Sequence, residues 1–505
     1  MFGKALVAIA CAPLLFAQPQ RELLNGKEVG REIHFPAGTE SGVKEFFPSF
    51  FEYQDLMLFH PRIGYYSAGL VDFQDDFSTY PNTLAPFFGH MIAEQAYRMW
   101  AGMRKAGTLL ATEQFTIAEF GAGNGALAES ILEYINHRPE WQEFARQLIY
   151  ACYDRSPTMN QAQRNRNWHF GKQFEARQED ATGLNAKSLK GLILSNEMLD
   201  NFSVHKVILS PTGSAEVAFV VPVLSAEAKP YLSEGTLALV EKDNRTIKGR
   251  LSADDTRIYL SRAALVSVLE SLSKSRDYRS RLKAIQFFEI YLPARLVPEL
   301  AGDLSRNARY YAHELAKVDK GIVAYINLGE SKYMHAAGAA LAAGYVITID
   351  YGSSWDGLTA FGPYGKLRTY GPGSVKEKPD PYAFPTQNDI TTDINFGHMA
   401  EEGKPAGLKP VYFGYQRAIE TGTQVSLDHL PTDHQLTDRQ VTDFKTWSFY
   451  FRTVRSFKVL VQQKEGTDPA YSFPDRNPLP LGIDDKELTP AQRKRASGIE
   501  AKLTY

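Results

Sequence analysis

The sequence predicts an α/β fold built on a mostly parallel sheet. Between residues 115 and 206, short apolar stretches alternate with amphipathic helical segments, which is the pattern of βαβ units. The alternation resumes near residue 326 and reaches a buried stretch at 344–352 that ends on an acid and a glycine. A glycine-rich turn at 121–125 separates the first apolar stretch from the first helix, at the edge where open α/β sheets bind ligands. We therefore expect an α/β sheet with a ligand site at this turn.

The apolar and amphipathic stretches assign the elements of this sheet. We expect strands at residues 115–120, 148–153, 173–176 and 191–195, with helices at 126–134 and 158–166 between them. Later in the chain we expect a helix at 332–343 and strands at 344–350, 366–370, 410–414 and 457–461. Right-handed crossovers place successive strands of this kind in parallel.

Other regions lie outside this alternation. Residues 207–325 carry a hairpin with a Pro-Thr-Gly turn and helical segments at 263–274 and 294–315, so we expect an insertion that acts as a lid or a substrate-facing subdomain. Residues 40–105 look helical, with helices at 46–58 and 87–103 joined by two loops. The expected parts are a signal-like segment, an N-terminal helical and loop region, the first part of the α/β domain, the insertion, the rest of the α/β domain and a loose C-terminal tail (1–20, 21–110, 111–206, 207–325, 326–470 and 471–505).

The N-terminus resembles a secretory signal peptide. Lys4 precedes an apolar run at residues 5–17 that ends on a small residue and is short for a membrane span. An uncleaved anchor or a transit peptide are the alternatives. A site for a cofactor that is made in the cytoplasm would conflict with export, so the sequence leaves the compartment open. No later stretch is apolar enough to cross a bilayer, and we expect a soluble mature protein.

Composition excludes several kinds of site. The net charge of −2, with both signs interspersed, gives no general attraction to nucleic acid. Cys11 and Cys152 are the two cysteines, too few for a disulfide framework or a cysteine-based zinc site. The eleven histidines show no ligand spacing, and we expect no metal site. The oligomeric state cannot be read from the sequence.

The glycine turn is compatible with two cofactors. Gly121 and Gly123, followed by Ala126, satisfy a loose dinucleotide fingerprint. Glu119 followed by Gly121, Gly123 and Gly125 fits a turn that binds S-adenosylmethionine (SAM). A carboxylate at Glu119 repels a pyrophosphate but can accept a hydrogen bond from the α-ammonium group of SAM, which carries no phosphate.

Acids at the neighbouring strand ends favour SAM. Asp154 ends the second strand and suits ribose hydroxyls, although it lies farther along than a dinucleotide site requires. Asp180 follows the third strand and could accept from the adenine amino group, and Asn196 and Glu197 end the fourth. Each acid alone is as readily a helix cap or an exposed strand end. Their recurrence at three successive strand ends predicts a SAM site.

Seven motifs, in the same order, resemble the MidA-like SAM-dependent methyltransferases, a family that includes a mitochondrial complex I assembly-factor arginine methyltransferase. The similarity runs from about residue 45 to about residue 465 and covers the insertion poorly. The motifs are Pro61–Tyr66, Asp76–Pro81 with Phe88-Gly89, Glu119–Gly125, Asn196–Asp200, Ile349–Gly352, Asp389–Thr391 with Asn395-Phe396, and Phe457–Leu460.

The resemblance implies a class I methyltransferase sheet with N-terminal loops folded over the SAM pocket. It implies that Phe77, Thr79 and Pro81 belong to that pocket. The chain departs from the family at Asn82, at Ser203 and at Tyr325-Ile326, where the family has Glu, Pro and a Glu-containing pair. Two of these departures remove an acid near a possible acceptor site.

Methyl transfer is an in-line displacement, so the protein mainly positions the acceptor and manages its proton. Glu197 and Asp200 are the candidate catalytic residues, because they follow the fourth strand and a guanidinium acceptor calls for carboxylates. The resemblance implies a protein substrate methylated on arginine. The alternatives are a SAM-fold assembly factor with little turnover and an NAD-binding protein.

Overall fold

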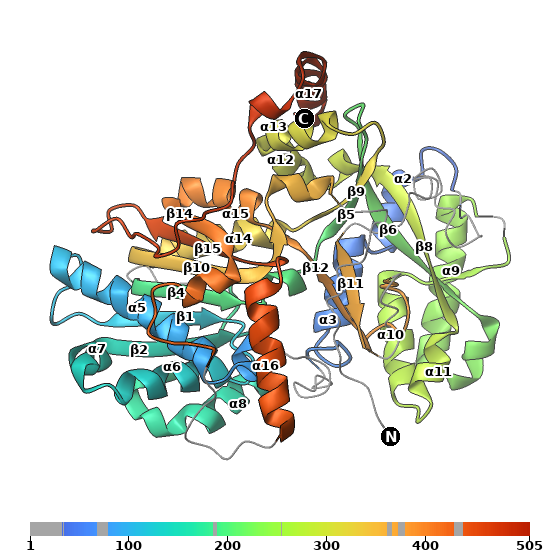
Figure 1. The fold of residues 1–505 in the computed structure, drawn as a ribbon. Helices are drawn as coiled ribbons and strands as arrows, with labels where there is room; N and C mark the ends of the chain where they lie inside the picture. The colour runs from blue at the N-terminus through green and yellow to red at the C-terminus, as the bar shows by residue number, and fades with distance from the viewer. Residues whose placement is uncertain are drawn as a thin grey trace.

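A computed structural model of the chain describes residues 33, 35–67, 79–184, 189–253, 255–360, 366–371, 379–428 and 438–505. The signal-like segment and Phe77 lie outside the described residues. Two sheets lie side by side, and a two-stranded ribbon stands between them (Figure 1). None of the described helices is long and apolar enough to cross a membrane.

The larger sheet has the strand order β14–β15–β10–β4–β1–β2–β3. Its strands are parallel except β15, which is antiparallel to both of its neighbours. The fold class is therefore confirmed as α/β with a mostly parallel sheet. The bounds are β1 (Phe115–Phe120), β2 (Leu148–Asp154), β3 (Phe174–Gln178), β4 (Leu189–Asn196), β10 (Leu341–Ser353), β14 (Leu408–Tyr415) and β15 (Phe457–Lys464).

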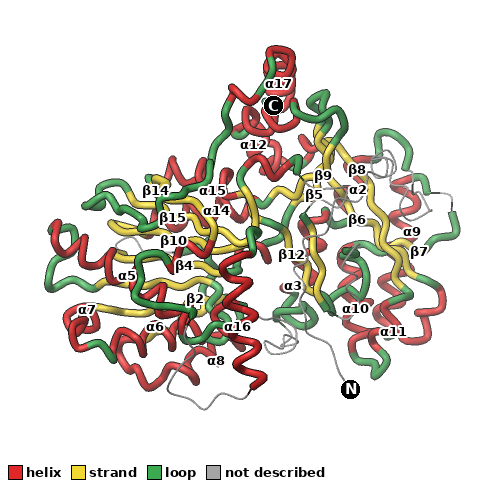
Figure 2. Tube along the Cα trace, viewed as in Figure 1, coloured by secondary structure: helices red, strands yellow, loops and turns green. Residues whose placement is uncertain are grey.

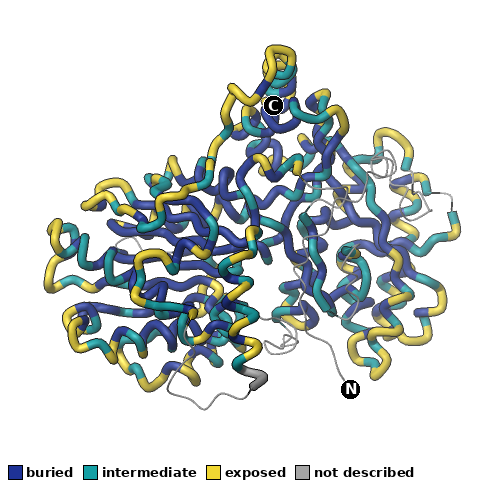
Figure 3. The backbone as a smooth tube through the Cα atoms, in the orientation of Figure 1, coloured by how far each residue is buried: buried dark blue, intermediate teal, exposed yellow. Residues whose placement is uncertain are grey.

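Helices cover both faces of this sheet because its strands are apolar on both sides. In β1, Ile117 packs into the core on the face of α5 and α6, whereas Ala118 packs into the core on the face of α14 and α15. Figure 3 shows the strands of both sheets as the buried centre of the molecule. The helices flanking this sheet are α5 (Phe87–Ala106), α6 (Ala126–Asn136), α7 (Gln142–Gln147), α8 (Pro157–Asn167), α14 (Leu328–Ala340) and α15 (Phe396–Gly403).

The second sheet is antiparallel and comes mainly from the expected insertion. Its order is β7–β6–β5–β9, and β8 also pairs with β6. The hairpin predicted around the Pro-Thr-Gly turn is confirmed by the pairing of β5 with β6. The domain boundaries themselves stay a prediction. The elements are β5 (His205–Leu209), β6 (Ala215–Leu224), β7 (Ile258–Tyr259), β8 (Ile285–Pro293), β9 (Ile322–Ile326), α9 (Glu234–Leu251), α10 (Arg262–Ser273), α11 (Tyr278–Leu282), α12 (Pro298–Arg306) and α13 (Ala308–Ala316).

The ribbon between the sheets consists of β11 (Leu367–Tyr370) and β12 (Asp389–Thr392), which are antiparallel (Figure 2). Gln54 of α3 (Phe50–Phe59) holds it in place by donating from Nε2 to the carbonyl of Ile390 at 2.9 Å. Oε1 of the same amide accepts from the backbone N–H of Val204 at 3.0 Å. The short strand β13 (Ile394–Asn395) then pairs with the end of β10.

Two expectations about helices were wrong. The helix expected at 46–58 is split, because Pro48 interrupts it: α2 (Glu40–Phe46) ends before this proline, and Ser49 caps α3. The expected loose C-terminal tail contains α17 (Pro490–Leu503), which begins with a capping box between Thr489 and Gln492. This helix packs on α13 and buries Ile499 and Leu503. The remaining helices are α4 (Tyr80–Thr83) and α16 (Asp438–Thr453).

Candidate functional site

A cavity of about 690 Å³ lies at the carboxyl ends of β1, β2 and β4. This is the edge where the strand order reverses, and open α/β sheets bind ligands there. The ribbon and the loop after α3 close its other side, and Trp447 of α16 lies at its wall. Its wall contains seven of the predicted site residues, namely Thr79, Gly121, Gly123, Asp154, Asp180, Glu197 and Asp200.

The glycine turn shapes one wall of the cavity. Gly121, Gly123 and Gly125 have φ angles of 67°, 52° and 80°, in the left-handed region that favours glycine. A Cβ atom at Gly121 would lie 2.7 Å from Cγ of Met198, so a larger residue there would displace a neighbour. The turn and the first residues of α6 thus form a close-fitting cradle, which suits the amino acid end of SAM.

Two acids lie along the neighbouring strand ends. Asp154 accepts a hydrogen bond of 2.8 Å from the backbone N–H of Ser156, and burial raises the pKa of its carboxyl to about 6. Asp180 accepts from the N–H and the hydroxyl of Thr182 at 2.8 and 2.6 Å, and its second oxygen lies 3.6 Å from Arg155. Both carboxyls line the cavity and can accept from hydroxyl or amino groups of a nucleoside.

Four predicted residues stand behind the cavity wall. Glu119 is buried, its Oε2 accepts from the hydroxyl of Tyr150 at 2.8 Å, and burial raises its pKa to about 7. Asn196 donates to Oε1 of Glu197 at 3.2 Å. Gly125 precedes α6, and Pro81 lies in the first turn of α4. Their contact with a cofactor stays a prediction. The structure places these four residues outside the lining of the cavity, close in the chain to residues that belong to it.

Glu197 and Asp200 lie together at the other end of the cavity. Glu197 has a φ angle of 49°, rare outside glycine, and its N–H donates to the carbonyl of Ile349 at 2.9 Å. Burial, with Asp200 nearby, raises the pKa of Glu197 to about 8. Burial also raises the pKa of Asp200 to about 6, although the hydroxyl of Tyr351 donates to it. Asp350 accepts the N–H groups of Leu199 and Asp200 at 3.1 and 3.3 Å and so fixes this turn.

Sequence reasoning missed the ribbon as part of the site. Arg368, Tyr370, Asp389 and Thr391 all line the cavity, and Asp389 is fully buried. The guanidinium of Arg368 pairs with Asp393 and lies 4.5 Å from the centre of the Tyr351 ring. The motif at 389–391 was the available signal, but only the fold brings it beside Glu197.

The loop after α3 adds a tyrosine to this end. The hydroxyl of Tyr66 donates to Oδ1 of Asn201 at 2.7 Å. Burial raises the pKa of Tyr66, and the nearby carboxylate of Asp389, also a hydrogen-bond partner, raises it further. Of the expected N-terminal cover, residues 59–67 and 79–80 thus contribute to the cavity wall, whereas α2 packs on α9 and α5 covers the sheet.

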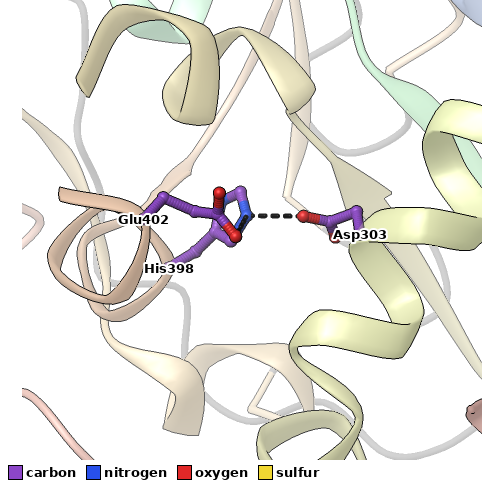
Figure 4. Close-up of side chains that lie close together, drawn as sticks. All are labelled: Asp303, His398 and Glu402. Atoms are coloured by element: carbon purple, nitrogen blue, oxygen red, sulfur yellow. Dashed lines mark hydrogen bonds and ion pairs between the residues drawn. The ribbon is translucent and has the colours of Figure 1, made fainter. Parts of the chain in front are cut away.

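The structure brings together one group of potential metal ligands among the described residues, Asp303, His398 and Glu402 (Figure 4). Sequence spacing did not reveal it, because Asp303 comes from α12. His398 donates from Nε2 to Asp303 at 2.9 Å, and its Nδ1 lies 2.6 Å from Oε2 of Glu330. Both ring nitrogens are therefore in use.

The carboxylates of this group are also satisfied. Asn307 donates to Asp303 and Glu402 at 3.2 and 3.0 Å, and Tyr311 donates to the second oxygen of Asp303 at 3.0 Å. The guanidinium of Arg306 lies 3.3 Å from Glu402. A cation already faces these carboxylates, so the contacts describe a closed polar network that joins α12 to α14 and α15.

Comparison with known proteins identifies the family. Residues 91–414 match the family described as "Putative S-adenosyl-L-methionine-dependent methyltransferase". A COG1565 superfamily member from Burkholderia thailandensis, solved with bound S-adenosyl-homocysteine, is 19% identical with a TM-score of 0.58 over 94% of this chain and all of that chain. A native structure of a COG1565 superfamily protein from the same organism is 18% identical, with a TM-score of 0.56 over the same shares. The search of curated proteins finds no match.

These matches agree with the geometry of the site. The acids at successive strand ends, which favoured SAM over a dinucleotide, line the cavity beside the glycine turn. The expected resemblance to MidA-like proteins, which form the same superfamily, is confirmed. The chain belongs to this family of SAM-dependent methyltransferases, and SAM is its cofactor.

Proposed function

We propose that this methyltransferase transfers the methyl group to a guanidinium nitrogen of an arginine in a protein substrate. The observation that carries the proposal is the acidic end of the cavity. Glu197, Asp200 and Asp389 line it from two separate parts of the chain, and Asp200 and Asp389 are buried. Several carboxylates close together in a buried site are unfavourable and a bound cation would offset that cost, so this end of the cavity favours a cationic acceptor.

The ribbon's own cation leaves this end acidic. The guanidinium of Arg368 pairs with Asp393 and lies over the Tyr351 ring, and its charge also lowers the pKa of Asp200, so this one cation offsets the three carboxylates only in part. The ammonium of Lys458 on β15 does not pair with these carboxylates. It donates to the carbonyls of Gly352 and Arg455 at 2.7 Å each. A bound guanidinium could therefore pair with Glu197, Asp200 or Asp389, and carboxylates bind guanidinium groups in a directed, two-pronged way.

The chemistry divides between cofactor and protein. SAM supplies an electrophilic methyl group on a sulfonium. The protein orients the acceptor nitrogen and takes up the proton that this nitrogen loses. Glu197 and Asp200 are the proposed catalytic residues: their raised pKa values, about 8 and about 6, make each carboxylate a better base than an exposed acid.

The proposed cofactor contacts follow the wall from the glycine turn to the end of β3. Gly121 and Gly123 face the amino acid end, where Glu119 behind them accepts from the ammonium. Asp154 accepts from the ribose hydroxyls, and Asp180 accepts from the adenine amino group. Thr79 and Glu197 both line the cavity. Asn82 donates to the hydroxyl of Thr79 at 3.1 Å.

Two of the departures from the family pattern, Asn82 and Tyr325, do not line the cavity. Asn82 supports Thr79, and Tyr325 lies on β9 near the buried pair of Lys206 and Glu289. Neither substitution removes a carboxylate that lines the cavity. This favours an active enzyme over an assembly factor that binds SAM without turnover.

Transfer of radiolabelled methyl from SAM to arginine-containing peptides and to a protein extract tests the proposal. Label in methylarginine is expected, and Asp200→Asn and Asp389→Asn should lower it at least tenfold while SAM still binds by calorimetry. Asp319→Asn, whose side chain is 98% exposed, is the control and should retain activity. Label in another residue or in a small molecule would contradict the arginine acceptor. SAM binding without any transfer would support the assembly-factor alternative.

A further inference from the structure

The buried face of α8 is made of amides. Asn160, Gln163 and Asn167 are the buried residues of this helix, at spacings that place them on one side. Gln163 and Asn167 are fully buried. The neighbouring α6 buries leucine and isoleucine instead. An amide is unfavourable in a protein interior unless it is hydrogen-bonded. The N–H groups on this face therefore require hydrogen-bond acceptors.

For Gln163 and Asn167, these acceptors are backbone carbonyls of the glycine turn. Gln163 donates from Nε2 to the carbonyl of Gly123 at 2.9 Å. Asn167 donates from Nδ2 to the carbonyl of Gly125 at 3.1 Å. A Cβ atom at Gly125 would lie 2.7 Å from Nδ2 of Asn167, so the amide occupies the space beside the turn. The two side chains thus hold the turn by its backbone.

The hydrogen bond to Gly123 also orients the next N–H group. The carbonyl of Gly123 and the N–H of Asn124 belong to one planar peptide unit and point in opposite directions. With the carbonyl held toward α8, the N–H of Asn124 points away from the helix. Within the described part of the chain this N–H has no hydrogen-bond partner. It is therefore an oriented donor in a turn whose Gly123 lines the cavity.

The helix that carries these amides is itself anchored. At its start, Asp154 accepts the N–H of Ser156, the residue that caps α8. Arg164 donates to the carbonyl of Ala176 on β3 at 2.9 Å, and Arg166 pairs with Glu129 of α6 at 2.6 Å. The helix therefore connects the end of β2, which carries Asp154, to the glycine turn.

We propose that Gln163 and Asn167 are positioning residues for SAM binding. They hold the glycine turn in the conformation in which the N–H of Asn124 can donate to the carboxylate of the cofactor, and they fix the distance of the turn from Asp154. The role concerns cofactor binding alone and does not depend on which acceptor is methylated.

Substitution Gln163→Glu gives a test with its own pH signature. A protonated glutamic acid can still donate to the carbonyl of Gly123, whereas the carboxylate repels that carbonyl. Calorimetry should give a SAM affinity close to that of the wild type at pH 5, and about tenfold weaker relative to it at pH 8.5. Gln161→Glu is the matched control: the side chain of this exposed residue of the same helix donates to Asn165, and the SAM affinity of this variant should follow the wild type throughout.

Two further variants keep the test decisive. Asn167→Asp acts on the other carbonyl and should show the same pH-dependent loss. Gln163→Met, which cannot donate at any pH, should bind SAM about tenfold more weakly at both pH values, measured well below its melting temperature. Affinities within twofold of the wild type for folded variants, even with a lower melting temperature, would overturn the proposal and leave only a structural role.

Discussion

The hydroxyl of Tyr150 on β2 donates a hydrogen bond of 2.8 Å to Oε2 of Glu119 on β1, two residues before the glycine turn. Burial raises the pKa of Glu119 to about 7. The folded protein therefore retains a proton here that the unfolded chain loses at lower pH. The contribution of Glu119 to stability falls as the pH rises from about 4.5 to about 7 and is constant above that range.

Substitution Glu119→Gln should make the free protein more stable at pH 8, because glutamine removes a buried charge and still accepts from Tyr150. At pH 5 the melting temperatures should be nearly equal. SAM should bind the variant more weakly at pH 8, since the amide is a poorer partner for an ammonium group. Glu133→Gln on the exposed side of α6 is the control. A melting temperature lowered at pH 8 would contradict this account of Glu119.

The pH dependence of methyl transfer should report the acidic end of the cavity. Glu197 has a pKa raised to about 8 by burial and Asp200, so kcat/KM should rise as the pH approaches and passes this value. Glu197→Gln should abolish the rise and lower kcat by about 10²–10⁴-fold while changing SAM affinity little. Steady-state rates from pH 6 to pH 9.5 check this. A profile that Glu197→Gln leaves unchanged would exclude Glu197 as the proton acceptor.

Substitution Gly121→Ala should disable cofactor binding beyond its effect on stability. Its φ angle of 67° is strained for alanine, at about 1–2 kcal/mol, and its Cβ would press on Met198. Gly107→Ala is a matched control, because Gly107 has a φ angle of 79° and open space around its Cβ position, at the end of α5. Both should lose stability by denaturant unfolding, Gly121→Ala the more because of Met198, but only Gly121→Ala should lose SAM binding when each is measured as a folded protein. Equal SAM affinities would argue against the cradle.

Substitution His398→Gln should destabilise the protein by about 3–5 kcal/mol at pH 7, because it leaves the buried carboxylate of Glu330 without its cation and Asp303 with Arg306 alone. Burial alone would lower the pKa of His398, but Asp303 and Glu330 outweigh it and hold this pKa well above its usual range. The stabilisation is thus complete below about pH 6.5 and is lost as the pH rises through the folded value. His169→Gln, at an exposed histidine outside this network, is the control. A chelator should leave the melting temperature unchanged, and a large shift would contradict a metal-free network.

The sequence was sufficient for the parts of the fold that follow local periodicity. Apolar stretches and amphipathic helices predicted the strands of the α/β sheet, except that the strand predicted at 366–370 lies in the ribbon. Acids at strand ends predicted Asp154 and Asp180 at the cavity, because strand ends share one edge. The C-terminal helix was missed although Thr489 and Gln492 form a capping box, since its apolar contacts are as few as Ile499 and Leu503.

The acidic end shows what periodicity cannot supply. Asp389 lies on a short ribbon, and Gln54, more than three hundred positions earlier, is one of the residues that fix where that ribbon stands. The buried network of His398 depends in the same way on Asp303, which lies on α12. Such contacts arise from packing between distant segments, and their residues carry no spacing that marks them in advance.

The pairing of β5 with β9 has a consequence for how the chain folds. β4 and β10 are neighbours in the sheet, yet Leu189 pairs with Leu341, so a long loop must close before this contact forms. Because His205 pairs with Ile326, the second sheet brings the two ends of that loop together. If the second sheet forms first, only residues 197–204 and 327–340 remain to be ordered before β10 can dock. The antiparallel sheet would then keep the chain segments that lead to β4 and β10 close together while the parallel sheet forms.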